Sequence, residues 1–317
     1  MKLKTKNIVT TLLLLLILFF IIITLPQKKY ILCDDECKFN IETSGYYSFI
    51  TKHQDLDRKY DIYIPKNFEE SKQYPLVFVF HGGGGKPENA KRMTGMSQLA
   101  DKENFIVVYP SGTTNRTMSF LTWNAGDCCG FATLSNIDDI GFIKKIINNT
   151  KNNLNIDSNK IFATGFSNGA MMSYKIACEL PDIFKAVGTV SGTLAYEECN
   201  PKESINIIHF HGDADYYASY DGGIGEKQIS NPREDKSVVD TIKFWANINE
   251  CIDYKTNKFG NIIHDVYTCN NSKIELYTIK QGGHAWPGGN PGIRYGNIDE
   301  PNQEIIATEL IWEFFKK

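Results

Sequence analysis

The sequence predicts an α/β fold in which a mostly parallel central sheet carries helices on both faces. Runs of Val, Ile and Phe recur along the chain at intervals too long for hairpins, and such runs suit strands buried on both sides. Helical patterns lie between the runs, so the connections are crossovers. The 317 residues, 42% of them hydrophobic, are enough for one large globular domain.

The expected elements begin with two antiparallel strands, at 46–50 and 59–64. In the second, Tyr60, Ile62 and Ile64 alternate with polar residues, which is typical of a strand with one buried face. The apolar runs of the parallel part are 76–80, 105–109, 161–164, 186–190, 205–210 and 274–279. The helical patterns cover 88–104, 138–153, 170–179, 238–249 and 303–315.

Residues 1–29 are predicted to be a signal peptide or an uncleaved signal anchor. Three lysines within the first six residues precede an apolar run from Ile8 to Leu25, which is the pattern of an export signal. The run is long for a cleaved signal and reaches transmembrane length, so both alternatives stay open. In either case residues 30–317, expected to be a single domain, lie outside the cytoplasm.

Eight cysteines, all beyond the apolar run, agree with an oxidising compartment. Short separations favour the pairs Cys33–Cys37, Cys178–Cys199 and Cys251–Cys269. The adjacent Cys128 and Cys129 could bridge each other only through a strained ring, so links to other cysteines stay open. No pair of C-x-x-C motifs has zinc-ligand spacing, and we expect no metal.

The charge of the chain gives no reason to expect a polyanionic partner. The net charge is −3, and Lys and Arg are spread along the sequence rather than gathered in blocks. We therefore expect no nucleic-acid partner, and contact with a membrane only through the N-terminal apolar segment.

The most informative motif is Gly165-Phe166-Ser167-Asn168-Gly169. It follows the short apolar run 161–164, and the helical pattern 170–179 begins directly after it. Strand, tight turn and helix in this order form the context of a nucleophile elbow, in which the serine lies at the apex. The glycines suit the strained turn and the close approach of neighbouring backbones. Ser167 is therefore the candidate nucleophile.

Partners for a serine nucleophile lie further along the chain, at the ends of other expected strands. His284, in a glycine-rich turn, is the candidate base, and Asp215 is the candidate carboxylate that holds the imidazole. Asp213 competes for the carboxylate role. The chain order Ser, Asp, His is that of α/β-hydrolases.

A tetrahedral oxyanion needs backbone donors. The N–H of Asn168 and the glycine loop at Gly83 are the candidates. The run from Gly82 to Gly85 is not followed by Gly-Lys-Ser/Thr, which argues against a phosphate-binding loop.

Other residues have a structural and a functional interpretation. His81 and His211 each precede a glycine, and we expect them to orient loops by hydrogen bonds. Trp123 and Trp286 are either core aromatics or substrate contacts. Asp138 and Asp139 could suggest a metal, but they more simply open the following helix as its cap and dipole partner.

Five blocks of the sequence together resemble the extracellular poly(3-hydroxybutyrate) depolymerase and feruloyl esterase family. The blocks are His81-Gly82-Gly83-Gly84, Trp123-Asn124-Ala125-Gly126-Asp127-Cys128-Cys129-Gly130, the serine motif, His211-Gly212-x-x-Asp215 and Gly283-His284-Ala285-Trp286-Pro287-Gly288-Gly289. The resemblance extends from about Arg58 to Phe315.

The resemblance implies an α/β-hydrolase fold, carboxylic ester hydrolysis and no metal or organic cofactor. It assigns the nucleophile to Ser167, the acid to Asp215, the base to His284 and an oxyanion donor to Gly83. It also implies a substrate contact by Trp286. Where the family often has Val-Pro-Tyr after the acid, this chain has Tyr-Tyr-Ala-Ser-Tyr at 216–220, so the resemblance does not fix the pocket shape or the substrate.

The expected function is an exported serine carboxylesterase that acts on polyester oligomers or on feruloyl or acetyl esters of plant polysaccharide. One alternative is a serine peptidase of the prolyl-oligopeptidase type, although the chain has no propeller segment before the candidate catalytic part. The other alternative is a binding protein with this fold that has lost catalysis. The sequence leaves open which ester is cleaved and whether the leader is removed.

Overall fold

The computed structural model describes residues 29–35, 37–41, 43–115, 120–228, 233–290 and 299–317. Residues 31–317 form one compact unit, which is described below. The apolar run from Ile8 to Leu25 lies outside the described residues. Among the helices that are described, none is both long enough and apolar enough to cross a membrane.

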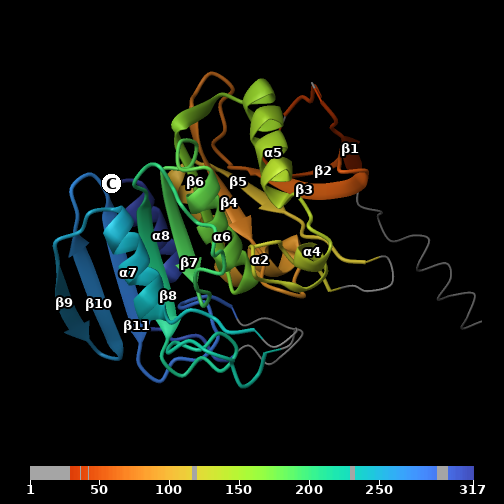
Figure 1. Ribbon diagram of the computed structural model, residues 1–317. Helices are drawn as coiled ribbons and strands as arrows, with labels where there is room; N and C mark the ends of the chain where they lie inside the picture. The colour runs from red at the N-terminus through yellow and green to blue at the C-terminus, as the bar shows by residue number, and fades with distance from the viewer. Residues whose placement is uncertain (1–28, 36, 42, 116–119, 229–232, 291–298) are drawn as a thin grey trace, which may run out of the picture. The chain divides into compact units, whose positions relative to one another are not determined.

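Within the described residues, eleven strands form one sheet, in the spatial order β1-β2-β3-β5-β4-β6-β7-β8-β11-β10-β9 (Figure 1). The central strands from β5 to β11 pair in parallel, and antiparallel strands flank them on both sides. The strands are β1 Tyr30–Leu32, β2 Gly45–His53, β3 Leu56–Ile64, β4 Tyr74–Phe80, β5 Ile106–Pro110, β6 Ile156–Phe166, β7 Ala186–Val190, β8 Asn206–Gly212, β9 Asp253–Phe259, β10 Ile262–Thr268 and β11 Lys273–Ile279.

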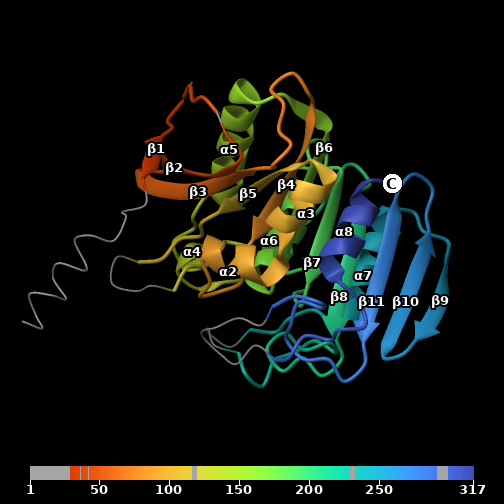
Figure 2. The ribbon, with the colours of Figure 1, turned by 180° about the vertical axis from the view of Figure 1, so that it is seen from behind.

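Helices cover both faces of the parallel part, as the crossover connections predict. Figure 1 shows α5, α6 and α7 on one face, and Figure 2 shows α3 and α8 on the other. The helices are α2 Pro87–Thr94, α3 Met96–Glu103, α4 Gly130–Leu134, α5 Asp139–Asn153, α6 Asn168–Glu179, α7 Val238–Ile248 and α8 Ala307–Phe315. The predicted α/β fold is confirmed.

The apolar runs supply both faces of the sheet. In β4, Leu76, Phe78 and Phe80 belong to the hydrophobic cluster under α5, α6 and α7, whereas Val77 and Val79 belong to the cluster under α2, α3 and α8. Successive residues of a strand point to opposite faces, so a strand between two helix layers must be apolar throughout.

Several elements differ from the sequence-based prediction: β1 and α4 were not expected, and α8 begins at Ala307 rather than at residue 303. The helix expected over 88–104 is broken at Gly95, which adopts a left-handed conformation with φ of 62° and separates α2 from α3. The hairpin of β9 and β10 was not predicted, because every residue of β9 is exposed and no apolar alternation marks it. Its two-residue turn, Gly260-Asn261, is a recognisable hairpin signal.

Four disulfides join the eight cysteines in sequential pairs. The three predicted local pairs, Cys33–Cys37, Cys178–Cys199 and Cys251–Cys269, are confirmed. Cys128 and Cys129 pair with each other rather than with distant cysteines, and the peptide bond between them is cis.

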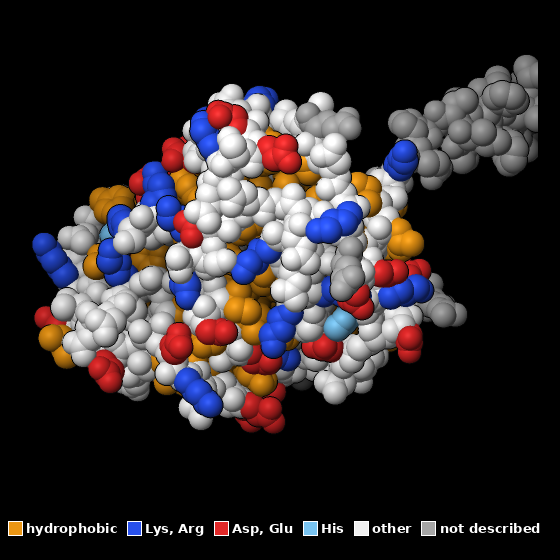
Figure 3. Space-filling view, turned by 90° about the horizontal axis from the view of Figure 1, so that it is seen from above, with side chains coloured by type: hydrophobic (Ala, Val, Ile, Leu, Met, Phe, Trp, Pro, Cys, Tyr) orange, Lys and Arg blue, Asp and Glu red, His pale blue; other side chains and the backbone are white. Residues whose placement is uncertain are grey.

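Charged side chains of both signs are interspersed on the face that Figure 3 shows. This agrees with the even spread of Lys and Arg along the sequence. The expectation about nucleic acid stays a prediction.

Candidate active site

The serine motif forms a sharp turn between β6 and α6. Ser167 has φ of 55° and ψ of −123°, a strained conformation for a residue with a side chain, and α6 begins at the next residue. Its backbone N–H donates to the carbonyl of Val190 at the end of β7, 2.9 Å away. Ser167 is partly exposed although the residues on either side are buried. The predicted elbow is therefore present, with the serine at its apex.

The two glycines of the motif are required by close backbone contacts. A Cβ at Gly165 would collide with the carbonyl of Gly169, and a Cβ at Gly169 would collide with the carbonyl of Phe80 at the end of β4. The turn can therefore be this tight only with glycine at both positions.

His284 and Asp215 form a buried pair beyond the carboxyl ends of β8 and β11. The Nδ1 of His284 lies 2.7 Å from Oδ2 of Asp215, and both side chains are buried. The other carboxylate oxygen accepts the backbone N–H groups of Tyr217 and Ala218, each at 2.9 Å. The carboxylate is thus held by three donors, and it holds the imidazole in turn.

Burial opposes the ionisation of Asp215, but the charge of His284 and the hydrogen bond from it outweigh burial and hold the pKa of the carboxyl below its usual value. An ionised carboxylate only accepts hydrogen bonds, so His284 Nδ1 carries the proton. In the neutral form of His284 this is the ring's only N–H, and Nε2 is left as the nitrogen that can take up a proton.

Asp213, the competing candidate, lies elsewhere. Its carboxylate accepts the backbone N–H of Gln281 at 2.5 Å and pairs with the Lys280 ammonium. It therefore ties the loop after β8 to the turn after β11, and Asp215 is the carboxylate in contact with His284.

Phe166 connects the elbow to the acid–base pair. Its ring centroid lies 4.6 Å from that of His284, and Phe166 directly precedes Ser167. Tyr217 packs on the same imidazole at 5.0 Å, and Asp299 accepts the His284 backbone N–H at 2.8 Å. Sequence reasoning missed these last two contacts, because neither residue belongs to a recognisable motif.

The glycine loop after β4 lies against the elbow. A Cβ at Gly82 would be 3.3 Å from Cβ of Ser167, and one at Gly83 would be 3.7 Å from Cβ of Asn168. His81 fixes this loop from within: its Nδ1–H donates to the Gly82 carbonyl at 2.8 Å, and its Nε2 accepts from the Gly112 N–H at 3.0 Å.

The structural interpretation of His81 is confirmed by these contacts. Complete burial lowers its pKa to about 4, so the ring is neutral at neutral pH and can accept at Nε2. The candidate oxyanion donors, Gly83 and Asn168, therefore lie on two segments that contact each other, one after β4 and one at the start of α6.

Asn168 also joins the elbow to the Trp123 segment. Its Oδ1 accepts the Trp123 N–H at 2.8 Å, and its Nδ2 donates to the Trp123 carbonyl at 3.2 Å and contacts Cys128 Sγ at 3.7 Å. The Trp123 indole is fully buried and donates to the His81 carbonyl at 2.9 Å. Trp123 thus packs behind the site, and a substrate contact by it stays a prediction.

Trp286 is buried on the other side of the sheet. Its Nε1–H donates to Thr308 Oγ1 at 2.9 Å, and Thr308 donates to the Thr94 carbonyl at 2.6 Å. These contacts join the segment after His284 to α8 and α2. They agree with the interpretation of Trp286 as a core aromatic, and its role in substrate binding stays a prediction.

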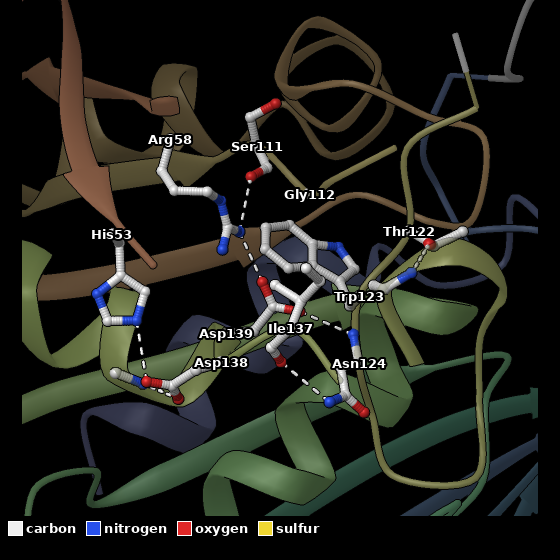
Figure 4. A network of polar contacts seen from close by, with 12 residues as sticks. His53, Arg58, Ser111, Gly112, Thr122, Trp123, Asn124, Ile137, Asp138 and Asp139 are labelled. Atoms are coloured by element: carbon white, nitrogen blue, oxygen red, sulfur yellow. Dashed lines mark hydrogen bonds and ion pairs between the residues drawn. The ribbon is translucent and has the colours of Figure 1, made fainter. Parts of the chain in front are cut away.

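A buried ion pair lies beside the Trp123 segment (Figure 4). Arg58 Nη2 lies 2.6 Å from Oδ1 of Asp139, and both side chains are buried. Oδ2 of Asp139 accepts the Asn124 N–H at 2.8 Å. Asp138 caps α5 by accepting the Gly141 N–H, as predicted. The two acidic residues therefore have partners within the fold.

We expect Arg58→Met to destabilise the fold by about 3–5 kcal/mol, because it leaves the Asp139 carboxylate buried without a cation. Urea unfolding followed by circular dichroism measures this. The double variant R58M/D139N should recover part of the loss. Lys52→Met, at an ion pair exposed on both sides, is the matched control and should leave stability unchanged. If the single variant Arg58→Met were as stable as the wild type, the buried Arg58–Asp139 ion pair would not stabilise the fold as we expect.

Fold and site geometry together define a hydrolase of the α/β class, with the serine turn, the histidine and the carboxylate at the carboxyl ends of parallel strands. The family model "Esterase PHB depolymerase" matches residues 58–229. The chain belongs to this family, and the predicted family and carboxylic ester hydrolase class are confirmed.

Known proteins with similar sequences are named as esterases. The chain is 30% identical over 269 residues to "Probable feruloyl esterase C" of Aspergillus oryzae, covering 83% of this chain and 85% of that protein. It is 28% identical over 242 residues to "Feruloyl esterase B" of Piromyces equi, covering 74% of this chain but 44% of that longer protein.

Among solved structures, an acetyl xylan esterase from Aspergillus awamori aligns with a TM-score of 0.54 at 20% identity. The alignment covers 72% of this chain and 89% of that one. At this identity the likeness supports the fold.

Proposed function

We propose that this chain is an exported serine carboxylesterase with Ser167 as nucleophile, His284 as general base and Asp215 as the orienting carboxylate. The main support for this proposal is the buried hydrogen bond of 2.7 Å between His284 and Asp215, which lies beside the serine elbow. Nucleophile, base and orienting group are the three parts that activation of a serine requires.

In the proposed reaction His284 Nε2 takes the proton from Ser167 Oγ as Oγ attacks the ester carbonyl carbon. The carbonyl oxygen becomes an oxyanion, which the N–H groups of Gly83 and Asn168 stabilise. The C–O bond to the alcohol then breaks, and His284 gives its proton to the leaving alkoxide. Water repeats the cycle on the acyl-enzyme, releases the acid and restores Ser167.

The substrate that we propose is an acyl ester of a polysaccharide, with a polyester oligomer as the second choice. The names of several relatives support this order, since they are feruloyl esterases of Aspergillus oryzae and Piromyces equi and an acetylxylan esterase of Coprinopsis cinerea. Tyr217, against the His284 ring, and Phe120, against Gly84, are the aromatic side chains that we expect to border the bound ester.

The four disulfides agree with an extracytoplasmic location. We further propose that residues 1–29 direct export, either as a cleaved signal or as an anchor. N-terminal sequencing of the mature protein separates these two cases.

A substrate panel tests the proposed function. We expect acetate release from acetylated xylan and ferulate release from methyl ferulate to exceed cleavage of 3-hydroxybutyrate oligomers, and we expect no cleavage of a peptide p-nitroanilide. The variant Ser167→Ala provides the background rate for each substrate. Peptide cleavage without ester cleavage would replace the proposal with the peptidase alternative.

A further inference from the structure

Two buried histidines lie behind the acid–base pair, and the proposed reaction does not use them. His209 and His211 are two residues apart on β8, so their side chains point to the same face of the sheet. Both are fully buried, and their ring centroids are 5.3 Å apart. A pair of imidazoles in a hydrophobic layer needs an explanation, because burying polar groups is costly unless they are hydrogen-bonded.

Their hydrogen bonds form one continuous chain. His211 Nε2 lies 2.7 Å from the carbonyl oxygen of Ala218, and His211 Nδ1 lies 3.1 Å from His209 Nε2. At the far end, His209 Nδ1 lies 2.9 Å from the hydroxyl of Tyr174 and 2.7 Å from that of Thr189. This series of hydrogen bonds therefore extends from α6 and β7, through β8, to the loop that carries Asp215.

The donor and the acceptor of each hydrogen bond in this series can be deduced by starting from the Ala218 carbonyl. A carbonyl oxygen can only accept, so His211 Nε2 carries a proton. Burial lowers the pKa of both imidazoles, so each ring is neutral and has one N–H. His211 Nδ1 then accepts from His209 Nε2–H, and the single lone pair of His209 Nδ1 accepts from one of the two hydroxyls beside it, those of Tyr174 and Thr189. One tautomer of each ring satisfies the whole chain.

The series of hydrogen bonds ends at the turn that holds the carboxylate of Asp215. His211 fixes the carbonyl of Ala218, and the N–H of the same Ala218 donates to Asp215 Oδ1 at 2.9 Å. His211 Nε2 also lies 3.5 Å from Asp215 Oδ2, the oxygen that contacts His284. A shift of the Ala218 backbone would therefore move the carboxylate relative to His284.

We propose that His211, held in a single tautomer by His209, is a positioning residue that fixes the 215–218 turn and thereby aims the Asp215 carboxylate at His284 Nδ1. The inference rests on the proposed function of Asp215 and His284. His211 does not exchange a proton with substrate in this account. It acts through the Ala218 peptide, and its contribution is the geometry of the acid–base pair.

The variants His211→Leu and His211→Gln test this proposal. Leucine removes the donor to Ala218, and we expect kcat for ester hydrolysis to fall about 100-fold with KM within about two-fold, because a small misplacement of a catalytic group can cost this much. The glutamine amide can donate to the same carbonyl and should keep kcat within about ten-fold of the wild type. His264→Leu, on β10, which is separated from β8 by β11, is the matched control and should retain full activity.

A second readout does not depend on turnover. The His284–Asp215 proton should give a far-downfield ¹H resonance in the wild type and in His211→Gln, and this resonance should be absent in His211→Leu. If His211→Leu does not fold, the double variant Tyr174→Phe/Thr189→Val can be used instead. It removes both hydroxyls that contact His209 Nδ1 and leaves the residues of β8 unchanged. It should also lower kcat while KM stays nearly unchanged.

Wild-type kcat together with an unchanged resonance in His211→Leu would overturn the proposal. So would equal losses of kcat in the leucine and glutamine variants when both fold normally. A wild-type protein that cleaves no ester would instead overturn the proposed function, and the resonance would still report whether His211 positions Asp215.

Discussion

Ser167→Ala should lower kcat for ester hydrolysis by about a million-fold, to a rate set by the oxyanion donors and substrate binding alone. The physical reason is that no other group at the elbow can form the acyl-enzyme, so catalysis by His284 has no nucleophile to activate. Stopped or continuous assays with a p-nitrophenyl ester measure the loss. The fold should be intact, because alanine keeps the Cβ and the backbone hydrogen bond to Val190.

The matched control is Ser158→Ala, an exposed serine on the same strand β6, which should retain wild-type activity. Substantial turnover by Ser167→Ala, after purification away from host esterases, would remove Ser167 as the nucleophile. The elbow geometry would then be a feature of the fold without a chemical role.

Asp215→Asn should lower kcat by about ten-thousand-fold at neutral pH. The asparagine oxygen can still accept the N–H groups of Tyr217 and Ala218, so its amide nitrogen faces His284 Nδ1 as a donor. The imidazole must then place its proton on Nε2, where it cannot accept the proton of Ser167. The reaction therefore loses its base although the side chains keep their positions.

Asp213→Asn separates this effect from a general loss of charge near the site. Asp213 contacts Lys280 and Gln281 rather than His284, so its substitution should change kcat little. Equal losses in the Asp213 and Asp215 variants, measured under the same conditions, would contradict the assignment of the orienting carboxylate.

The parallel layers could be predicted because their cause is local in the sequence. A strand buried on both faces must be apolar at every position, as in β4, and helical periodicity must lie between such strands. The hairpin of β9 and β10 has no apolar pattern, because the exposed strand β9 buries little and is held by backbone pairing, and only the Gly260-Asn261 turn marks the hairpin in the sequence. The break at Gly95 depends on a single left-handed residue within a long helical pattern.

The reactive residues could be predicted because each lies at the end of an apolar run, next to glycines. Ser167, Asp215 and His284 follow three different strands, and parallel strands bring their carboxyl ends to the same edge. The contacts of Asp299 and Tyr217 with His284 could not be predicted, because they join loops that the sequence does not relate.

The roles of Trp123 and Trp286 could not be predicted from the motifs that contain them. Trp123 and Trp286 lie within sequence blocks typical of the family, yet both are buried and donate their N–H groups to partners within the fold. A residue's place in a motif does not distinguish contact with substrate from support of the loop that carries the motif. Burial and hydrogen bonding, which are tertiary properties, make that distinction.

The proposed mechanism requires that His284 activates Ser167 to form a covalent intermediate. The most direct measurement is intact-protein mass spectrometry after treatment with a fluorophosphonate, followed by peptide mapping. We expect one phosphonyl group per chain on the peptide that contains Ser167, no adduct in Ser167→Ala and much slower labelling in His284→Ala. An enzyme that cleaves esters but stays unlabelled, or carries the group on another residue, would contradict the account.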